Sequence, residues 1–325
     1  MSVGQRANLV LGNRSGYELF YSHRRANTLD ADLFWGPDRA LEFIRRHGAV
    51  TEGADWLDEI WAEGGVVLDL DARHVLFFGG EDVLFDVPLR RVHLSLMRAL
   101  WPGWTVQWAH GHIAELASYV GRDGEDLLDM DVDPSWVPEL KEPAERGWIS
   151  SLISVRRADG TWKLHALDVD IADVALLGPR WLPRLFAASL PAEYDYAARS
   201  SSFPTGGLHI NEARRGVEVW LAHPKGAFER RLRAAWAGWD VSWHYDRFEA
   251  ITDQIGSRLT LPFSTEEALV EQVSSIVLRA PPDRSELDVD GPSTARDDPS
   301  APRLDVWKAQ FAHAVDLWRG RASMR

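Results

Sequence analysis

Short runs of apolar residues alternate with polar turns at the start of the chain. Residues 7–12 and 17–22 are rich in Leu, Val, Phe and Tyr and flank a polar turn at 13–16. Two such runs around a short turn predict a β-hairpin. Gly36-Pro37 then opens a segment with helical spacing, because proline suits the first turn of a helix. We therefore expect two strands followed by a helix over residues 37–46.

The same kind of pattern continues to Gly121. Residues 66–79 predict a second hairpin that turns at 71–73. Residues 89–100 carry Leu and Val at the spacing of an amphipathic helix. A short strand at 105–110 and a last helix complete the segment. The order ββα–ββα–βα predicts an α+β fold with a mainly antiparallel sheet covered by helices.

The second half of the chain repeats this pattern. Residues 98–121 and 233–256 align without a gap at an offset of 135, and eight of the 24 positions are identical, three of them tryptophan. Upstream, Gly36-Pro37 matches Gly178-Pro179 at an offset of 142. Self-similarity in which the order of elements is kept is typical of a duplicated unit. We interpret the chain as a tandem duplication of one α+β unit.

Composition along the chain divides it into five segments. They are a first α+β repeat at 1–122, an acidic connection at 123–147, a second repeat at 148–280, a flexible Pro/Ser/Asp-rich linker at 281–303 and a C-terminal helix at 304–325. The apolar residues of the last segment form one stripe: Leu304, Trp307, Phe311, Ala314 and Trp318. Such a stripe must dock on the chain itself or on a partner, and we expect it to dock on the chain itself.

Bulk composition narrows the class of protein. The chain has 325 residues, 45% hydrophobic and 26% charged, which suits two globular domains. It has no cysteine, which excludes disulfides, zinc–thiolate sites and a cysteine nucleophile and fits a reducing cytosol. No apolar run reaches the roughly 18 residues of a membrane helix, and no apolar leader segment begins the chain. We predict a cytoplasmic protein without membrane contact.

Charge and tryptophan content bear on partners. The net charge of −13 disfavours nucleic acid and favours a basic partner, although it also serves solubility. The chain has 16 tryptophans, a residue that anchors cores and interfaces. The pattern Trp-x-Gly-Trp-x-Val-x-Trp occurs at 101–108 and at 236–243. We expect these tryptophans to wedge a helix against the sheet, with the glycines permitting a tight turn.

The segment 21–36 holds the most unusual polar sequence. Its six candidate ligand-binding residues are Tyr21, His23, Arg24, Asn27, Asp30 and Trp35. The second repeat lacks this polar elaboration. One interpretation is a small-molecule pocket in which His23 acts as acid or base and Arg24 holds a carboxylate or phosphate. The alternative is a solvated loop in which Asp30 or Thr28 caps a helix.

Other patterns point less clearly to chemistry. His110-Gly-His112 would suit two metal ligands on a strand, but no third ligand lies nearby, and we expect ordinary surface or core histidines. Asp129, Asp131 and Asp133 lack the glycine and glutamate of a calcium loop. No nucleophile elbow, zinc-protease helix, phosphate loop or dinucleotide fingerprint occurs. We expect no metal and no cofactor, and no catalytic residue is assigned.

Two hypotheses of function follow. The first is an acidic cytosolic binding protein without catalysis, of the immunity, antitoxin or regulatory kind, whose charge would complement a basic protein partner. The alternative is a small-molecule-binding domain or an enzyme of hydrolase or transferase type, with its site around residues 21–36. We expect a monomer, because an internal duplicate can satisfy the interface that a dimer would supply.

Overall fold

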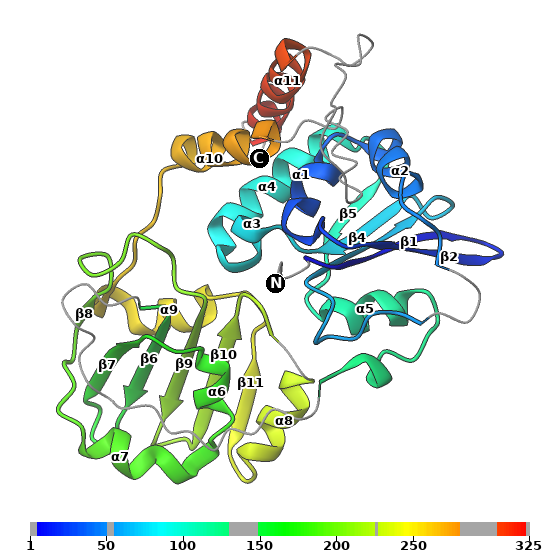
Figure 1. Cartoon of the computed structure of the whole chain (residues 1–325). Helices are drawn as coiled ribbons and strands as arrows, with labels where there is room; N and C mark the ends of the chain where they lie inside the picture. The colour runs from blue at the N-terminus through cyan, green and yellow to red at the C-terminus, as the bar shows by residue number, and fades with distance from the viewer. Residues whose placement is uncertain (1–4, 51–54, 130–148, 225–226, 280–303, 323–325) are drawn as a thin grey trace, which may run out of the picture. The chain divides into compact units, whose positions relative to one another are not determined.

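A computed structural model describes residues 5–50, 55–129, 149–224, 227–279 and 304–322. The chain forms two compact units (Figure 1). The first unit comprises Met1–Val83, Leu89–Leu127 and Thr265–Arg325, and the second comprises Leu84–Pro88 and Leu128–Ser264. In the described part of the chain, no helix is both long and apolar enough to cross a membrane.

The first unit is built on a five-stranded sheet with the order β2-β1-β3-β4-β5. Its strands are β1 (Ala7–Asn13), β2 (Gly16–Ser22), β3 (Gly64–Asp69), β4 (His74–Phe78) and β5 (Thr105–Trp108). The pairs β1–β2 and β3–β4 are antiparallel hairpins, whereas β1–β3 and β4–β5 are parallel. The prediction of a mainly antiparallel sheet is therefore wrong, and the sheet is mixed. The chain passes through helices before it adds β3 and β5, and such crossovers produce parallel neighbours.

Helices cover both faces of this sheet. They are η1 (Ala26–Thr28), α1 (Leu29–Phe34), α2 (Pro37–Arg45), α3 (Glu81–Phe85), α4 (Val87–Leu100), α5 (His112–Tyr119) and η2 (Glu125–Leu127). Figure 1 shows α5 on one face and α1, α2 and α4 on the other. The helix α5 packs against β3 and β4. A side chain at Gly65 of β3 would overlap Leu116 of α5, so the glycine lets the helix approach the sheet closely.

The second unit has a sheet of the same plan, in the order β11-β10-β9-β6-β7. Its strands are β6 (Ser151–Arg156), β7 (Trp162–Leu167), β9 (Gly206–Asn211), β10 (Gly216–Leu221) and β11 (Asp240–Trp243). A small second sheet pairs β8 (Tyr194–Asp195) with β12 (Leu259–Thr260). The helical segments are α6 (Ile171–Ala175), η3 (Gly178–Trp181), α7 (Leu182–Ala187), α8 (Phe228–Ala235), α9 (Glu249–Ile255) and η4 (Gly256–Arg258).

The pairing registers of the two sheets agree with the sequence offsets. Ala7 pairs with Gly64 across β1 and β3, and Ser151 pairs with Gly206 across β6 and β9. Across the last two strands of each sheet, His74 pairs with Thr105 and Gly216 with Asp240. Read from β7 to β11, the second sheet therefore has the strand order, directions and inner registers of the first.

One tryptophan contact recurs in both units. The indole N–H of Trp101 donates to the carbonyl oxygen of Leu33 at 3.2 Å, and that of Trp236 donates to the carbonyl oxygen of Ala175 at 2.7 Å. Both rings are fully buried, at 1% and 0% exposure. Trp101 ties the end of α4 to α1, and Trp236 ties the end of α8 to α6. The packing interpretation of these tryptophans is confirmed.

The last two helices, α10 (Glu266–Arg279) and α11 (Leu304–Ala322), belong to the first unit. The helix α10 packs beside α1 and α11, although residues 148–280 were assigned to the second repeat from sequence. The ring of Trp307 lies 4.7 Å from that of Trp35, and Phe311 stacks on Phe34 at 6.0 Å. The expectation that the C-terminal helix docks on its own chain is confirmed.

This docking predicts that Trp307→Ala will release α11. Trp307 is 2% exposed, and losing a buried aromatic ring costs on the order of 3 kcal/mol. Hydrogen exchange of the amides of residues 304–322 should accelerate in the variant. The matched control is Val306→Ala, since Val306 is 52% exposed on the same helix and its loss should leave the exchange unchanged. Equal exchange in the two variants would contradict the docking.

Candidate functional site in the first unit

The polar segment after β2 folds as η1 and α1 and turns its acidic residues inward. Asp30 is 1% exposed and Asp32 is 6% exposed. Leu29 and Leu33 of the same helix are fully buried, so α1 is surrounded by protein on nearly all sides. A helix that is buried all round has no face left for its polar residues. The solvated-loop interpretation is therefore wrong for Asp30 and Asp32.

Asp32 has two polar neighbours. The hydroxyl of Thr28 donates to the Asp32 carboxylate at 2.9 Å, and the guanidinium of Arg25 lies 3.8 Å away. Burial nevertheless raises the pKa of Asp32 to about 6, because desolvation outweighs the opposing effects of Arg25 and Thr28. Thr28 stands at the N-cap position of α1 as expected from sequence, but its hydroxyl makes no capping hydrogen bond to the backbone and donates to Asp32 instead.

Asp30 is less well compensated. Its Oδ1 accepts the backbone N–H of Ala31 at 2.9 Å, while its Oδ2 is buried without a hydrogen-bond partner among the described residues. Burial raises the pKa of Asp30 to about 8, and the charges of Asp32 and Asp82 act in the same direction. At neutral pH this carboxyl is mostly protonated and uncharged.

A histidine from α4 completes the cluster. His93 is fully buried, and its Nε2 donates to the backbone carbonyl oxygen of Asp30 at 3.2 Å. Its Nδ1 is buried and has no partner among the described residues. Burial lowers the pKa of His93 to about 4, so the ring is neutral at pH 7. The ring of Phe34 lies 5.2 Å away, on the side of α1 that faces α11.

Gly80 closes the cluster from the end of β4. A side chain at Gly80 would place its Cβ 2.3 Å from the Asp30 Cγ, and the backbone has a φ of +89° there. Only glycine meets both conditions without strain. The backbone around Gly80 therefore packs directly on the Asp30 carboxyl and helps to exclude water from it.

Carboxyls with raised pKa values beside a neutral histidine are typical of acid–base sites, although structural networks also produce them. Here Asp30, Asp32 and His93 are all less than one-tenth exposed. A general acid must come within hydrogen-bond reach of its substrate. The cluster can hold protons in the core, but it presents no reactive atom at the surface.

The six residues expected to bind a ligand do not form one site. The hydroxyl of Tyr21 lies 2.9 Å from the Nδ1 of His23 at the protein surface, and Arg24 is also exposed. The side-chain amide of Asn27 donates to Glu81 at 3.5 Å, likewise at the surface. Asp30 points into the core, and Trp35 packs against Trp307. The structure brings Tyr21 and His23 together and separates both from Asp30.

Sequence reasoning missed His93 as a partner of this segment. His93 lies four residues after Leu89 and three before Leu96, on the apolar stripe of the helix predicted at 89–100. That spacing indicates a buried position. Arg90 of the same helix is 1% exposed, and its guanidinium lies over the Trp108 ring at 4.5 Å. The helical period could have identified His93 as an interior polar residue, whereas Arg90 lies outside that stripe.

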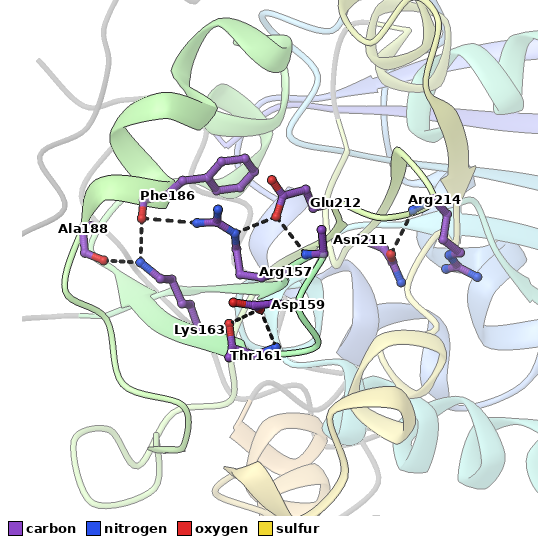
Figure 2. A network of polar contacts seen from close by, with 10 residues as sticks. Arg157, Asp159, Thr161, Lys163, Phe186, Ala188, Asn211, Glu212 and Arg214 are labelled. Atoms are coloured by element: carbon purple, nitrogen blue, oxygen red, sulfur yellow. Dashed lines mark hydrogen bonds and ion pairs between the residues drawn. The ribbon is translucent and has the colours of Figure 1, made fainter.

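A second polar network belongs to the second unit and is structural (Figure 2). Arg157 donates to Glu212 at 2.6 Å, and Lys163 donates to the carbonyl oxygens of Phe186 and Ala188 at 2.7 and 2.5 Å. Carbonyl groups at a helix C-terminus lack partners within the helix, and cations satisfy them. The network thus fastens the end of α7 to the β6–β7 hairpin.

The weaker sequence patterns do not form metal sites in the described part of the chain. His112 is buried at the start of α5 and stacks on Phe78 at 4.8 Å, so the two histidines do not share a strand face. Asp131 and Asp133 lie outside the described residues. Within those residues no group of three or more His, Cys, Asp or Glu is placed to hold a metal ion.

Comparison with known proteins supplies no relative. No family model, curated protein or solved structure matches this chain. The geometry described above is therefore the basis for any functional assignment.

The close approach of Gly80 to Asp30 predicts that Gly80→Ala destabilises the first unit more than Gly121→Ala. Both positions have positive φ, +89° and +81°, so both substitutions carry a similar backbone strain of about 1–2 kcal/mol. Only the Gly80 variant adds a clash, since nothing lies within 4 Å of a Cβ at Gly121. Urea unfolding measures the difference. Equal losses of stability would show that Asp30 is not confined.

The buried carboxyls predict an unusual pH dependence of stability. The folded pKa of Asp30 is about 8, against an ordinary value of 3.8, so the folded state holds a proton that the unfolded state releases. The contribution of this proton to folding stability is complete below about pH 4. It is lost as pH rises towards 8, and the free energy of unfolding then falls by up to about 1.4 kcal/mol per pH unit. The raised pKa of Asp32 lowers stability in the same way as pH rises towards about 6. The lowered pKa of His93 has the opposite effect, because stability falls as pH drops from 6.5 to about 4.

Above pH 6.5, Asp30 is therefore the member of this cluster that still titrates. Asp30→Asn should flatten the fall in unfolding free energy between pH 6.5 and 8, as measured by urea unfolding at several pH values. Asp305→Asn, on an exposed position of α11, is the control and should keep the wild-type slope. Parallel curves for wild type and Asp30→Asn would contradict the assignment.

Proposed function

We propose that this chain is an internally duplicated binding protein that acts through contact with a protein partner and not through catalysis. The observation that carries the proposal is the sealing of the first-unit cluster. Asp30, Asp32 and His93 have the shifted pKa values that catalysis would use, but their exposures are 1%, 6% and 0%. A substrate would have to unfold α1 to reach them.

Duplication and a monomeric state form part of the proposal. The two sheets share strand order and inner registers, and the tryptophan contacts of Trp101 and Trp236 repeat. Such agreement in detail supports descent of both units from one ancestral unit. A chain that carries two copies already holds what a homodimer would assemble.

The distribution of charge supports a basic partner. Residues 122–147 hold nine acidic and three basic residues, and residues 280–303 hold six acidic and three basic ones. These two segments account for −9 of the net charge of −13. Concentrated negative charge accelerates the encounter with a basic surface, and this acceleration weakens as the salt concentration rises. This pattern suits a cytoplasmic protein of the immunity, antitoxin or regulatory kind.

The alternative of a small-molecule site or enzyme around residues 21–36 receives less support. It requires Tyr21, His23 and Asp30 on one surface, whereas Tyr21 is half-buried, His23 is exposed and Asp30 is buried. A small ligand at that position would have to bind to the Tyr21–His23 pair alone.

Affinity capture tests the proposed function. The intact tagged chain, incubated in native lysate at low and moderate salt, should retain a stoichiometric basic protein, and less of it at moderate salt. Replacing the acidic residues of 122–147 by their amides should reduce capture, because steering charge is lost. A control with as many exposed carboxylates neutralised elsewhere among the described residues should capture normally. Absence of a partner at both salt concentrations would contradict the proposal.

A further inference from the structure

A polar row crosses the sheet of the second unit. Ser154 of β6 pairs with His209 of β9, which pairs with Glu218 of β10. Their exposures are 2%, 0% and 8%. The first unit has apolar residues at the corresponding positions, and they are Val10, Val67 and Leu76. The sheet of the first unit forms with valine and leucine at these positions. A sheet of this plan therefore does not require the polar row.

Most of this row is satisfied by hydrogen bonds. The Ser154 hydroxyl lies 2.9 Å from the Nδ1 of His209. The Glu218 carboxylate contacts Arg214 at 2.8 Å, His244 at 3.0 Å and Gln254 at 2.9 Å. The exception is the Nε2 of His209, which is buried and has no hydrogen-bond partner among the described residues. An unsatisfied buried polar atom costs stability and is often retained for a function.

An aromatic residue flanked by two arginines lies against this histidine. The ring of Trp162 stacks on the His209 ring at 5.4 Å with 26° between the planes. The guanidinium carbons of Arg156 and Arg258 lie 5.9 and 5.4 Å from the centre of the same Trp162 ring. Trp162 is half-buried, and both arginines are exposed.

These two arginines differ from others on the protein surface. Arg157, Arg214 and Arg233 each pair with a glutamate at 2.6–2.8 Å. Within the part of the chain that the structure describes, Arg156 and Arg258 form no ion pair with a carboxylate. Both contact the Trp162 ring, and Arg258 also donates to the carbonyl oxygen of Ile255 at 3.4 Å. In a chain of net charge −13, two cations at one indole ring, without an acidic partner among the described residues, constitute a local positive site.

The sequence offsets show that this site is peculiar to the second unit. Trp162 pairs with Arg156 across the β6–β7 hairpin, and Tyr17 pairs with Gly12 at the same place in the first unit. Arg258 aligns with Asp123 at the offset of 135. The first unit therefore has a glycine and an acidic residue at the positions of Arg156 and Arg258, and its nearby cation, Arg122 beside Tyr17, is paired with Asp55.

We propose that Arg156, Trp162 and Arg258 form a binding site for a small molecule that carries a phosphate or carboxylate group. Guanidinium groups bind such oxyanions through charge-assisted hydrogen bonds, and an indole ring holds an arginine in place by a cation–π contact. The argument for this site does not rest on the proposed protein partner.

Calorimetric titration of the full chain tests this site with inorganic phosphate, phenyl phosphate and benzoate at constant ionic strength. We expect at least one probe to bind, and Arg156→Gln and Arg258→Gln each to weaken its binding about tenfold, through loss of a charged hydrogen bond. Arg184→Gln is the matched control, an exposed arginine on α7 of the same unit, and it should bind as the wild type does.

The choice of probe separates the two sources of the anion. Binding of the two phosphates without benzoate identifies a phosphate ligand, and binding of benzoate identifies a carboxylate ligand. Circular dichroism checks that the variants are folded, which is expected because both side chains are exposed. Absence of binding of all three probes at millimolar concentration overturns the proposal. Binding that survives both glutamine substitutions overturns it as well.

Discussion

Each unit depends on one buried tryptophan that joins its long helix to its short helix. Trp101 and Trp236 bury their rings completely and still satisfy their indole N–H groups on a backbone carbonyl. A buried indole needs such a partner, because an unsatisfied donor in the core is costly. The contact therefore fixes both the depth and the direction of the ring. Once it forms, the following turn delivers the last strand beside β4 or β10.

Around this shared frame the two units place polar groups in different positions. The first unit buries carboxyls in α1, where the second unit has Ala172 and Val174 at the matching offset. The second unit buries His209 and Glu218 in its sheet, where the first has valine and leucine. Burying these polar groups carries a desolvation cost, which the hydrogen bonds of Glu218 partly offset. The frame tolerates them because the apolar packing of the remaining core is common to both units.

The first unit also needs a cover that the second does not. At the end of α1 it has Phe34 and Trp35, and the matching positions in the second unit are Leu176 and Leu177. The larger rings extend to α11, where Phe311 and Trp307 pack on them. The C-terminal helix thus completes the first unit by hydrophobic burial. Trp307, Phe311 and Ala314 of its apolar stripe are buried in this way, whereas Leu304 at its start is 45% exposed.

By itself, the sequence determined the order of the main strands, the positions of the longer helices and the self-similarity of the two halves, but it did not predict the helix α1. These follow from local periodicity and from turn residues such as Gly103 and Gly238, which both have φ of +79°. Only the tertiary structure decided that the sheets are mixed, because strand direction depends on where the intervening helix packs. It also decided that Asp30 faces the core while His23 faces solvent. Neighbours such as Gly80 and His93 enclose Asp30 from distant parts of the chain, and sequence spacing within 21–36 carries no information about them.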